Sequence, residues 1–155
     1  MKKIRQNIIE KKIDDVILRA KKKKDGDLQK SDYAKYICIL VSGYLEKSIT
    51  IKLMEYSEAR SNKKISRFVE NKIRRSTNLT SNKIIELLKM FDDSWGDNIY
   101  KKLDSKKRDH IDSLINLRNN IAHGGDSGIA LNHIIDIYDT VKQVLVDVYD
   151  TIGQF

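Results

Sequence analysis

The feature of this sequence that most constrains its fold is an apolar repeat near the C-terminal end. Seven apolar residues follow one another at alternating spacings of three and four: Leu131, Ile134, Tyr138, Val141, Leu145, Val148 and Ile152. Four acidic residues stand between them: Asp136, Asp139, Asp147 and Asp150. Since this spacing returns to one face of an α-helix, it predicts an amphipathic helix with one buried face. Ser127 is its predicted N-cap, because a serine hydroxyl can accept a hydrogen bond from a first-turn N–H.

Helical periodicity continues through the rest of the chain. The sequence contains no proline, and no segment shows the alternation typical of a half-buried strand. Further helices are predicted over about 4–24, from an N-cap at Ser31 or Asp32 to about Arg60, over 65–73, over 84–91, and from an N-cap at Asp104 or Ser105 to Gly124-Gly125. The glycine pair is a strong helix stop. The residues Thr77–Ser81 are predicted as a loop, and Trp95-Gly96-Asp97 as a turn.

The same spacing predicts the core. The long second helix would bury Ile37, Val41, Tyr44, Leu45, Ile49 and Leu53, and the short third helix carries the apolar residues Ile65, Phe68, Val69 and Ile73. There is no internal repeat, low-complexity linker or domain boundary. The sequence therefore predicts one domain over residues 1–155, with an all-α fold: an up-and-down helical bundle of about five to six helices.

Several classes of protein are excluded at this stage. The longest apolar run, Tyr36–Val41, has six residues, whereas a membrane-spanning helix needs about 20. Residues 1–7 have no apolar stretch behind them, so we expect no secretory signal. The single cysteine, Cys38, is expected to be a buried apolar side chain in a reducing compartment, which favours a cytoplasmic protein. The cysteine and the three histidines do not have zinc-ligand spacing, so we predict no metal and no cofactor.

The charge of the chain is positive and uneven. The formal net charge is +8. Residues 1–75 contain 21 basic and 10 acidic side chains, whereas residues 76–155 contain 9 and 12. Such asymmetry favours an anionic partner on one face, and nucleic acid is the usual candidate. A solvated lysine-rich surface explains the charge equally well.

One residue interrupts the apolar face of the helix that ends at Gly124-Gly125. The inward positions of this helix are Ile111, Leu114, Ile115, 118, Ile121 and Ala122. Position 118 holds an arginine, which is costly on a core-facing stripe unless it is paired or opens onto a cleft. His123 stands at the helix end, and Asn119 lies four residues before it on the same face. We therefore expect Arg118, Asn119 and His123 to converge on one polar patch.

Such a patch suits metal-free cleavage of RNA. An imidazole with an ordinary pKa near ~6.5 exchanges protons at neutral pH, and a guanidinium offers a fixed fork of donors to phosphate oxygens. His123 would move a proton at the 2′-hydroxyl or the leaving 5′-oxygen, and Arg118 would stabilise the transition state. Two chains related by a two-fold axis would supply both a base and an acid. Two plainer interpretations stay open: His123 as a helix C-cap, and Arg118 in a buried ion pair.

The segment Arg118-Asn119-Asn120-Ile121-Ala122-His123, followed by Gly124, resembles the signature of the HEPN superfamily (higher eukaryotes and prokaryotes nucleotide-binding). That signature is an arginine, four to six residues, and then a histidine. With the long helix before it and the amphipathic helix after it, the chain is most similar to the RiboL-PSP-type HEPN branch. The resemblance implies a helical bundle that dimerises with its two motifs facing each other. It also implies a metal-independent endoribonuclease of a toxin–antitoxin or antiviral system.

The resemblance also implies roles for individual residues. Arg118 and His123 match the catalytic pair, and Asn119 matches the polar residue after the arginine. Glu46 occupies a position where related domains often have an acidic residue, which would pair with Arg118; an exposed Glu46 beside Lys47 is an equal alternative. Some HEPN toxins carry a tyrosine two residues after the histidine, where a partner nucleotidyltransferase modifies it. This chain has Gly125 there, so we do not expect that control.

The leading prediction is a homodimeric, metal-independent endoribonuclease that cuts tRNA, rRNA or mRNA and works with an antitoxin or defence-system partner protein. The first alternative is a non-catalytic HEPN module that binds a partner, a nucleotide or RNA through the same helices. The second is a purely electrostatic nucleic-acid binder, which would use the basic N-terminal half of the chain. In that half, Lys11, Lys12, Arg19 and Lys21–Lys24 would follow an RNA backbone.

Overall fold

The computed structural model describes residues 2–125 and 128–155, and over these ranges the chain forms seven helices and no strand. In chain order they are α1 (Lys2–Lys21), α2 (Leu28–Arg60), α3 (Lys63–Ile73), α4 (Ser81–Phe91), α5 (Asp93–Lys102), α6 (Ser105–Ala122) and α7 (Leu131–Ile152). The predicted all-α bundle is confirmed. The helix count exceeds the expected five to six because α5 was not predicted.

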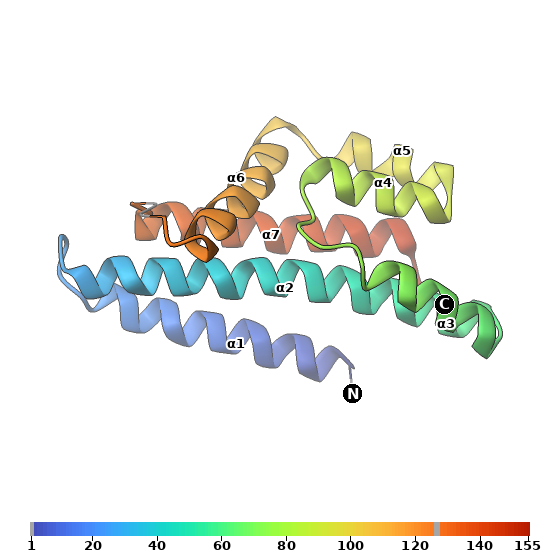
Figure 1. The fold of residues 1–155 in the computed structure, drawn as a ribbon, viewed down its shortest axis with the longest axis horizontal. Coiled ribbons are helices and arrows are strands. Elements are labelled where there is room, and N and C mark those ends of the chain that lie inside the picture. Colours follow the sequence, from blue (N-terminus) through green and yellow to red (C-terminus); the bar gives the residue numbers. More distant parts are fainter. Residues whose placement is uncertain (1, 126–127) are drawn as a thin grey trace.

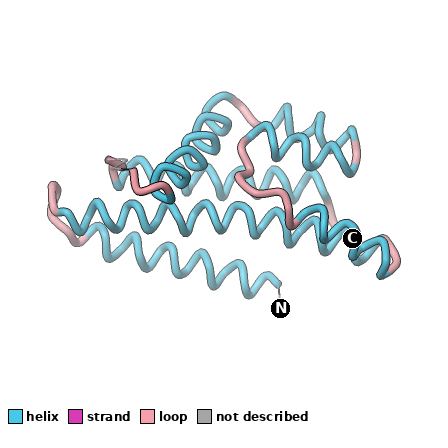
Figure 2. The backbone as a smooth tube through the Cα atoms, in the orientation of Figure 1, coloured by secondary structure: helices cyan, strands magenta, loops and turns pink. Residues whose placement is uncertain are grey.

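The two longest helices form the centre of the molecule. Figure 1 shows α2 and α7 side by side, with α1 along the other side of α2 and with α4, α5 and α6 packed on the α7 side. The short helix α3 folds back along the end of α2, and an irregular segment then carries the chain up to α4, as the backbone in Figure 2 shows. This segment, residues 74–80, passes close to α6 and takes part in the candidate site described below.

The core follows the predicted apolar spacing on the two central helices. All seven residues of the C-terminal repeat are buried in α7, and all six inward residues predicted for the second helix are buried in α2. Burial of this continuous apolar surface is the main favourable contribution to folding. The predicted short helix is present as α3; of its apolar residues, Ile73 is buried, whereas Ile65 and Phe68 are exposed. The helix α3 packs against the end of α2, so its outer half faces water.

Two predicted helix starts were wrong. The helix α2 begins at Leu28, because the Asp27 side chain accepts a hydrogen bond from the N–H of Gln29 (2.9 Å) and caps the helix before Ser31 or Asp32 is reached. The helix α7 begins at Leu131, with Ala130 in the N-cap position and no side-chain cap. Ser127, the predicted cap, lies outside the described residues.

The predicted turn Trp95-Gly96-Asp97 lies inside α5, so this prediction was also wrong. Asp92 starts α5 by accepting a hydrogen bond from the N–H of Ser94 (2.7 Å). The glycine is needed for packing, because a Cβ atom on Gly96 would lie 2.7 Å from the Cβ of Lys89 on α4. A glycine at a close helix contact gives the same sequence signal as a glycine in a turn. None of the described helices is long and apolar enough to cross a membrane.

Candidate active site

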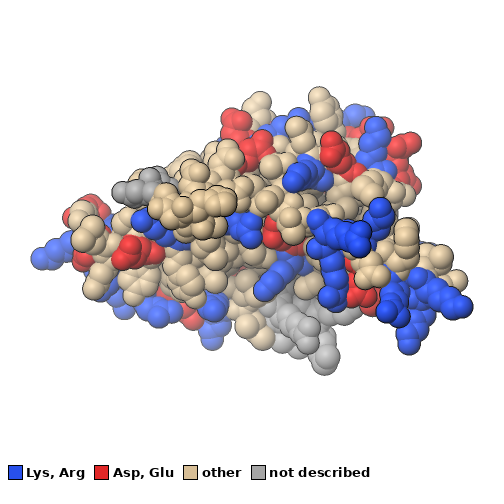
Figure 3. Space-filling model, viewed as in Figure 1, with Lys and Arg blue, Asp and Glu red and all other residues tan. Residues whose placement is uncertain are grey.

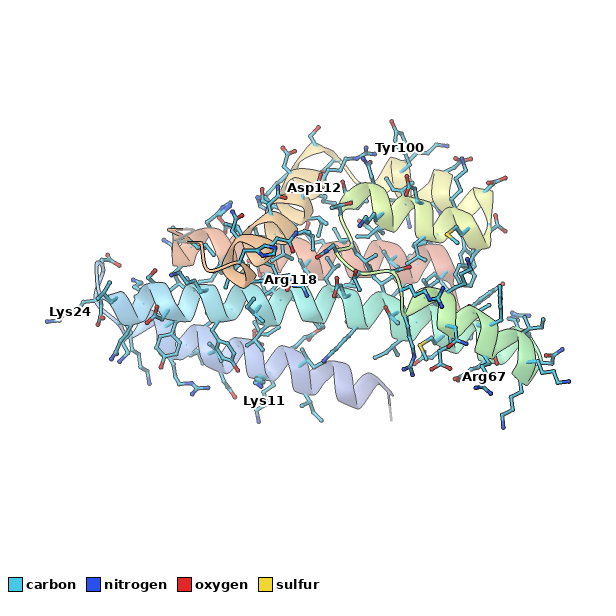
Figure 4. All side chains as sticks on the ribbon, viewed as in Figure 1. Lys11, Lys24, Arg67, Tyr100, Asp112 and Arg118 are labelled. Carbon is cyan, nitrogen blue, oxygen red and sulfur yellow. The ribbon has the colours of Figure 1, made fainter. Side chains whose placement is uncertain are left out.

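The helix α6 supplies the arginine of the candidate site. Asp104 caps its start by accepting from the N–H of Lys107 (2.9 Å), and Ile111, Leu114 and Ile115 fix its inner face in the core. Arg118 follows on the same stripe, one turn further on, and is half-buried. The side chain lies between α6 and the connection from α3 to α4 (Figure 4). The Arg118 side chain therefore lies on the inner face of α6, at the edge of the core.

Arg118 is held by an asparagine of that connection. Its Nη1 atom donates a hydrogen bond to Oδ1 of Asn78 (2.6 Å). The backbone N–H of Asn78 in turn donates to Oε1 of Glu46 on α2 (2.7 Å). The expected pairing of Glu46 with Arg118 is thus not direct, because Asn78 stands between the two side chains and bridges them. The bridge joins α2, the α3–α4 connection and α6.

The connection is fixed at its other end by α6 as well. Asp112 accepts two hydrogen bonds from Ser81, one from the backbone N–H (2.8 Å) and one from the hydroxyl (3.0 Å). Figure 4 labels Asp112 on the same helix as Arg118, six residues earlier, which is about 1.7 turns. Two contacts to α6 and one to α2 therefore determine the path of residues 78–81. Since this path carries Asn78, the position of the guanidinium depends on it.

The positive charge of Arg118 is not neutralised by a carboxylate in contact with it. Among the described residues, Arg118 takes part in no ion pair, and its hydrogen-bond partner is a neutral amide. Its field reaches the neighbouring thiol of Cys38, which lies 3.9 Å from the carbonyl oxygen of Leu114. Burial raises the pKa of the Cys38 thiol to about 11, and the guanidinium offsets part of that shift. The interpretation of Arg118 as a buried ion-pair member is not supported in the described part of the chain.

His123 occupies the end of α6. Its backbone N–H donates to the carbonyl of Asn119 (3.1 Å), and its imidazole is exposed. Gly124 has a φ of +74°, and the N–H of Gly125 closes the turn on the carbonyl of Asn120 (2.8 Å). The predicted glycine stop is confirmed, and it leaves the imidazole open to solvent or to a second molecule.

The structure does not bring the four predicted site residues into one set of direct side-chain contacts. Arg118 and His123 are five positions apart, so on an ideal helix their side chains leave it about 140° apart. Arg118 reaches Asn78 in the α3–α4 connection, whereas His123 is exposed to solvent. Asn119, which follows Arg118 in the sequence, is half-buried. Glu46 is half-buried and reaches the arginine only through Asn78. The polar residues instead extend from Asn78 to the end of α6, without direct contact between the side chains of Arg118 and His123.

Two residues of this site were missed from the sequence. Asn78 and Asp112 lie outside the Arg–His motif, and no spacing rule connects them to it. The one available signal was the residue type of Asn78: its φ is +54°, and asparagine is the side chain that most readily adopts this left-handed conformation. Asp112 gave no signal, because a carboxylate on a helix flank is usually solvated.

The remaining histidines lie elsewhere. His110 on α6 shares a hydrogen bond between its Nδ1 and Oγ1 of Thr140 (2.7 Å), and its ring stands edge-on to His133 at 6.0 Å. His133 is exposed. In the described ranges, no three His, Cys, Asp or Glu side chains are grouped as a metal site.

The architecture and the position of the motif define the class of protein. A seven-helix bundle in which the long helix before the last one ends in Arg-x4-His, followed by a glycine turn, has the HEPN fold. The chain matches the RiboL-PSP-HEPN family over residues 4–154, nearly its whole length, and it belongs to that family. It has no match among curated proteins or solved structures. The resemblance inferred from the sequence is therefore confirmed.

Proposed function

We propose that the protein is a metal-independent endoribonuclease that cleaves RNA at a composite site formed by Arg118 and His123 of two chains. Family membership suggests a ribonuclease or defence role. The observation that carries the proposal is the state of Arg118: its guanidinium is fixed by the neutral amide of Asn78 and has no carboxylate in contact among the described residues. A positive charge held in this way remains available to a phosphate group.

The chemistry follows from the two side chains. A neutral imidazole takes the proton from a ribose 2′-hydroxyl, whose oxygen forms a bond to the adjacent phosphorus while the bond to the 5′-oxygen breaks. A protonated imidazole gives a proton to the departing 5′-oxygen. Arg118 stabilises the extra negative charge on the non-bridging oxygens as it develops. The products are a 2′,3′-cyclic phosphate and a 5′-hydroxyl, and neither proton transfer in this scheme uses a metal ion.

A dimer supplies the two imidazoles that this scheme needs. Each chain contributes one His123, and its exposure at the end of α6 allows a second copy to approach it. A two-fold axis near Gly124 would place two imidazoles and two guanidinium groups around one phosphate. Asn119, half-buried on the same helix turn, would bind a ribose or phosphate oxygen there. Glu46 would act through Asn78 to position the arginine.

The test uses purified protein, a mixture of tRNA and rRNA, and buffer containing EDTA. The wild-type protein is expected to cut the RNA and to leave 5′-hydroxyl ends, whereas Arg118→Ala and His123→Ala should leave it intact. His133→Ala is the matched control, because this exposed histidine lies on α7 outside the site. Cutting that persists in both site variants, or that requires Mg²⁺, overturns the proposal. Expression of the same variants in bacteria, scored by growth arrest and RNA integrity, tests the toxin or defence role.

A second candidate is a non-catalytic module that binds RNA, a nucleotide or a partner protein of a defence or toxin–antitoxin complex. The observation that favours it is the separation of Arg118 from His123, which share no side-chain hydrogen bond in the described structure. This candidate predicts that wild-type protein and His123→Ala bind RNA equally and that neither cuts it. Cleavage by the wild type alone would eliminate it.

A further inference from the structure

The outer face of α3 is an exposed surface that neither the core nor the candidate site uses. We call it the α3 surface; it consists of the solvent-facing residues from Lys63 to Arg75. The segment contains six basic side chains and one acidic one. That acidic residue, Glu70, is half-buried and is bound by Arg74 at 2.5 Å, so it does not offset the other cations. Within α3, Ile73 is the one buried residue.

Four residues form a row along this surface. Lys64, Phe68 and Lys72 are spaced by four, Arg75 follows three residues later, and all four are exposed. Spacings of four place Lys64, Phe68 and Lys72 on one face of α3, about one turn apart, and Arg75 follows just beyond the end of the helix at Ile73. Phe68 is 64% exposed, which is unusual for a phenylalanine, and it stands between two lysines. The row therefore presents an aromatic face with a positive charge on either side.

The row leads toward the candidate active site. Arg75 lies three residues before Asn78, so their Cα atoms are at most about 11 Å apart. Asn78 is hydrogen-bonded to the guanidinium of Arg118. In Figure 3, Lys and Arg side chains gather over the end of the molecule that Figure 1 shows to be formed by α3. A chain molecule lying on the α3 surface can thus extend directly to Arg118.

We propose that the α3 surface binds single-stranded RNA and guides it to the Arg118 site. One base stacks on Phe68, and the flanking phosphates contact Lys64, Lys72 and Arg75. Stacking on an exposed aromatic ring between cations is how proteins hold single strands without reading their sequence. The part of this proposal that concerns delivery to the reacting phosphate rests on the proposed function, whereas the binding itself does not.

The observed chemistry favours RNA over two other occupants. On an ideal helix Lys72 lies between Ile65 and Phe68, about 20° from the first and 40° from the second, so the exposed apolar area is divided by a charge. A membrane-binding helix needs a continuous apolar face. A second copy of the chain is disfavoured because two α3 surfaces would bring like charges together. A polyanion with stacked bases complements both the charge and the ring.

The experiment measures binding separately from cleavage. The probe is a fluorescein-labelled single-stranded RNA of about 20 nucleotides, and all proteins carry His123→Ala so that the RNA stays intact. The charge variant combines Lys64→Gln, Lys72→Gln and Arg75→Gln. Its affinity is expected to fall at least tenfold, and the slope of log Kd against log salt should become shallower by about 2, because three phosphate contacts are lost. Fluorescence anisotropy at several salt concentrations gives both values.

The aromatic ring has its own variant. Phe68→Ala is expected to weaken binding at least about fivefold without changing the salt slope, because stacking releases no counterions. Phe68→Trp should restore the affinity. A salt slope that changes with Phe68→Ala, or a tryptophan variant that binds no better than alanine, contradicts the stacking role. Since these side chains are exposed, the variants should keep the wild-type melting temperature.

The control removes the same number of charges from α1, through Lys11→Gln, Lys12→Gln and Lys21→Gln, all of which are exposed. Equal weakening by the α1 and α3 variants overturns the proposal in favour of diffuse electrostatic binding. Loss of binding to phosphatidylserine vesicles in the α3 variant, with RNA binding unchanged, assigns the surface to a membrane instead. An α3 variant that binds RNA normally but is monomeric, while the parent is dimeric, assigns it to self-association.

The outcomes separate this proposal from the proposed function. If the protein binds RNA through the α3 surface but never cuts it, the surface stands and the nuclease does not. If the protein cuts RNA through Arg118 and His123, while the α3 substitutions leave binding unchanged and, placed in a chain that keeps His123, leave cutting unchanged, the nuclease proposal holds and the α3 surface proposal fails.

Discussion

Asn78 has the most specific role of any single residue in the site. Its φ of +54° disfavours most side chains, its backbone N–H binds Glu46, and its amide oxygen binds Arg118. Asparagine meets all three requirements, because it tolerates the left-handed conformation and carries a neutral acceptor. A neutral acceptor fixes the guanidinium without cancelling its charge. We therefore regard Asn78 as a positioning residue for Arg118.

Two substitutions at this position separate backbone from side chain. Asn78→Gly keeps the backbone conformation and the N–H bond to Glu46 but removes the acceptor for Arg118. We expect it to fold with nearly wild-type stability and to cut RNA at least tenfold more slowly, because the guanidinium loses its fixed orientation. Asn78→Asp keeps an oxygen in place but puts a carboxylate against the guanidinium, so it should also cut RNA slowly, because the positive charge of Arg118 is then neutralised. Cleavage rates together with urea unfolding curves provide the measurement, and equal activity of all three proteins would refute the positioning role.

Cys38 is predicted to be chemically inert in the folded protein. Burial raises the pKa of its thiol to about 11, from an ordinary value near 8.5, so the reactive thiolate is scarce at pH 8. Iodoacetamide should therefore modify the native chain at least a hundredfold more slowly than the urea-unfolded chain at that pH. As the pH rises from about 8.5 to 11, the unfolded thiol ionises first, and this group makes the native state progressively less stable. Mass spectrometry after timed labelling checks the rates; equal labelling of both states would show that Cys38 is accessible.

At the scale of the elements, the contact between α4 and α5 determines how the upper part of the bundle packs. Gly96 allows α5 to approach Lys89 so closely that no larger residue fits without movement. The helix α4 in turn is joined to α6 through Ser81 and Asp112. Packing in this part of the fold therefore extends to the connection that holds Asn78.

Alanine substitutions at two separate glycines, Gly96 and Gly43, test this contact. Gly96→Ala should lower the free energy of unfolding by about 1–2 kcal/mol, because the new methyl group meets the Cα and Cβ of Lys89 rather than a flexible end. Gly43→Ala on α2 is the matched control, since nothing lies within 4 Å of the Cβ position there. It should raise stability by up to about 1 kcal/mol through helix propensity alone. Denaturant unfolding measures both; stabilisation by Gly96→Ala would mean that the two helices do not approach in this way.

The sequence predicted the long elements well and the close contacts poorly. Apolar spacing placed α2, α6 and α7 and their buried faces, because long periodic segments average over local exceptions. It failed at Gly96, where a packing contact resembled a turn, and at Asp27, where an earlier cap started the helix. It found Arg118 because an arginine on an apolar stripe is costly. It missed Asn78, since a contact across forty residues of sequence depends on the path of a loop and not on any local pattern.

At the scale of the whole molecule, the proposed site is incomplete in one chain. Each chain has one His123, which is exposed, and one imidazole provides either the base or the acid. The proposed reaction therefore requires two chains. Each has a mass of 18.0 kDa, so sedimentation should give a particle of about 36 kDa at micromolar concentration. A monomer that cuts RNA at full rate would show that the composite site is wrong.

The most direct test of the whole account is the single-turnover cleavage rate of a labelled RNA in EDTA, measured for the wild type, Arg118→Ala and His123→Ala at matched folding stability. We expect the wild type to cut without metal and each substitution to slow the reaction at least a hundredfold, because both side chains act on the same phosphate. Equal rates in all three proteins, or cleavage by the wild type only when Mg²⁺ is added, would contradict it.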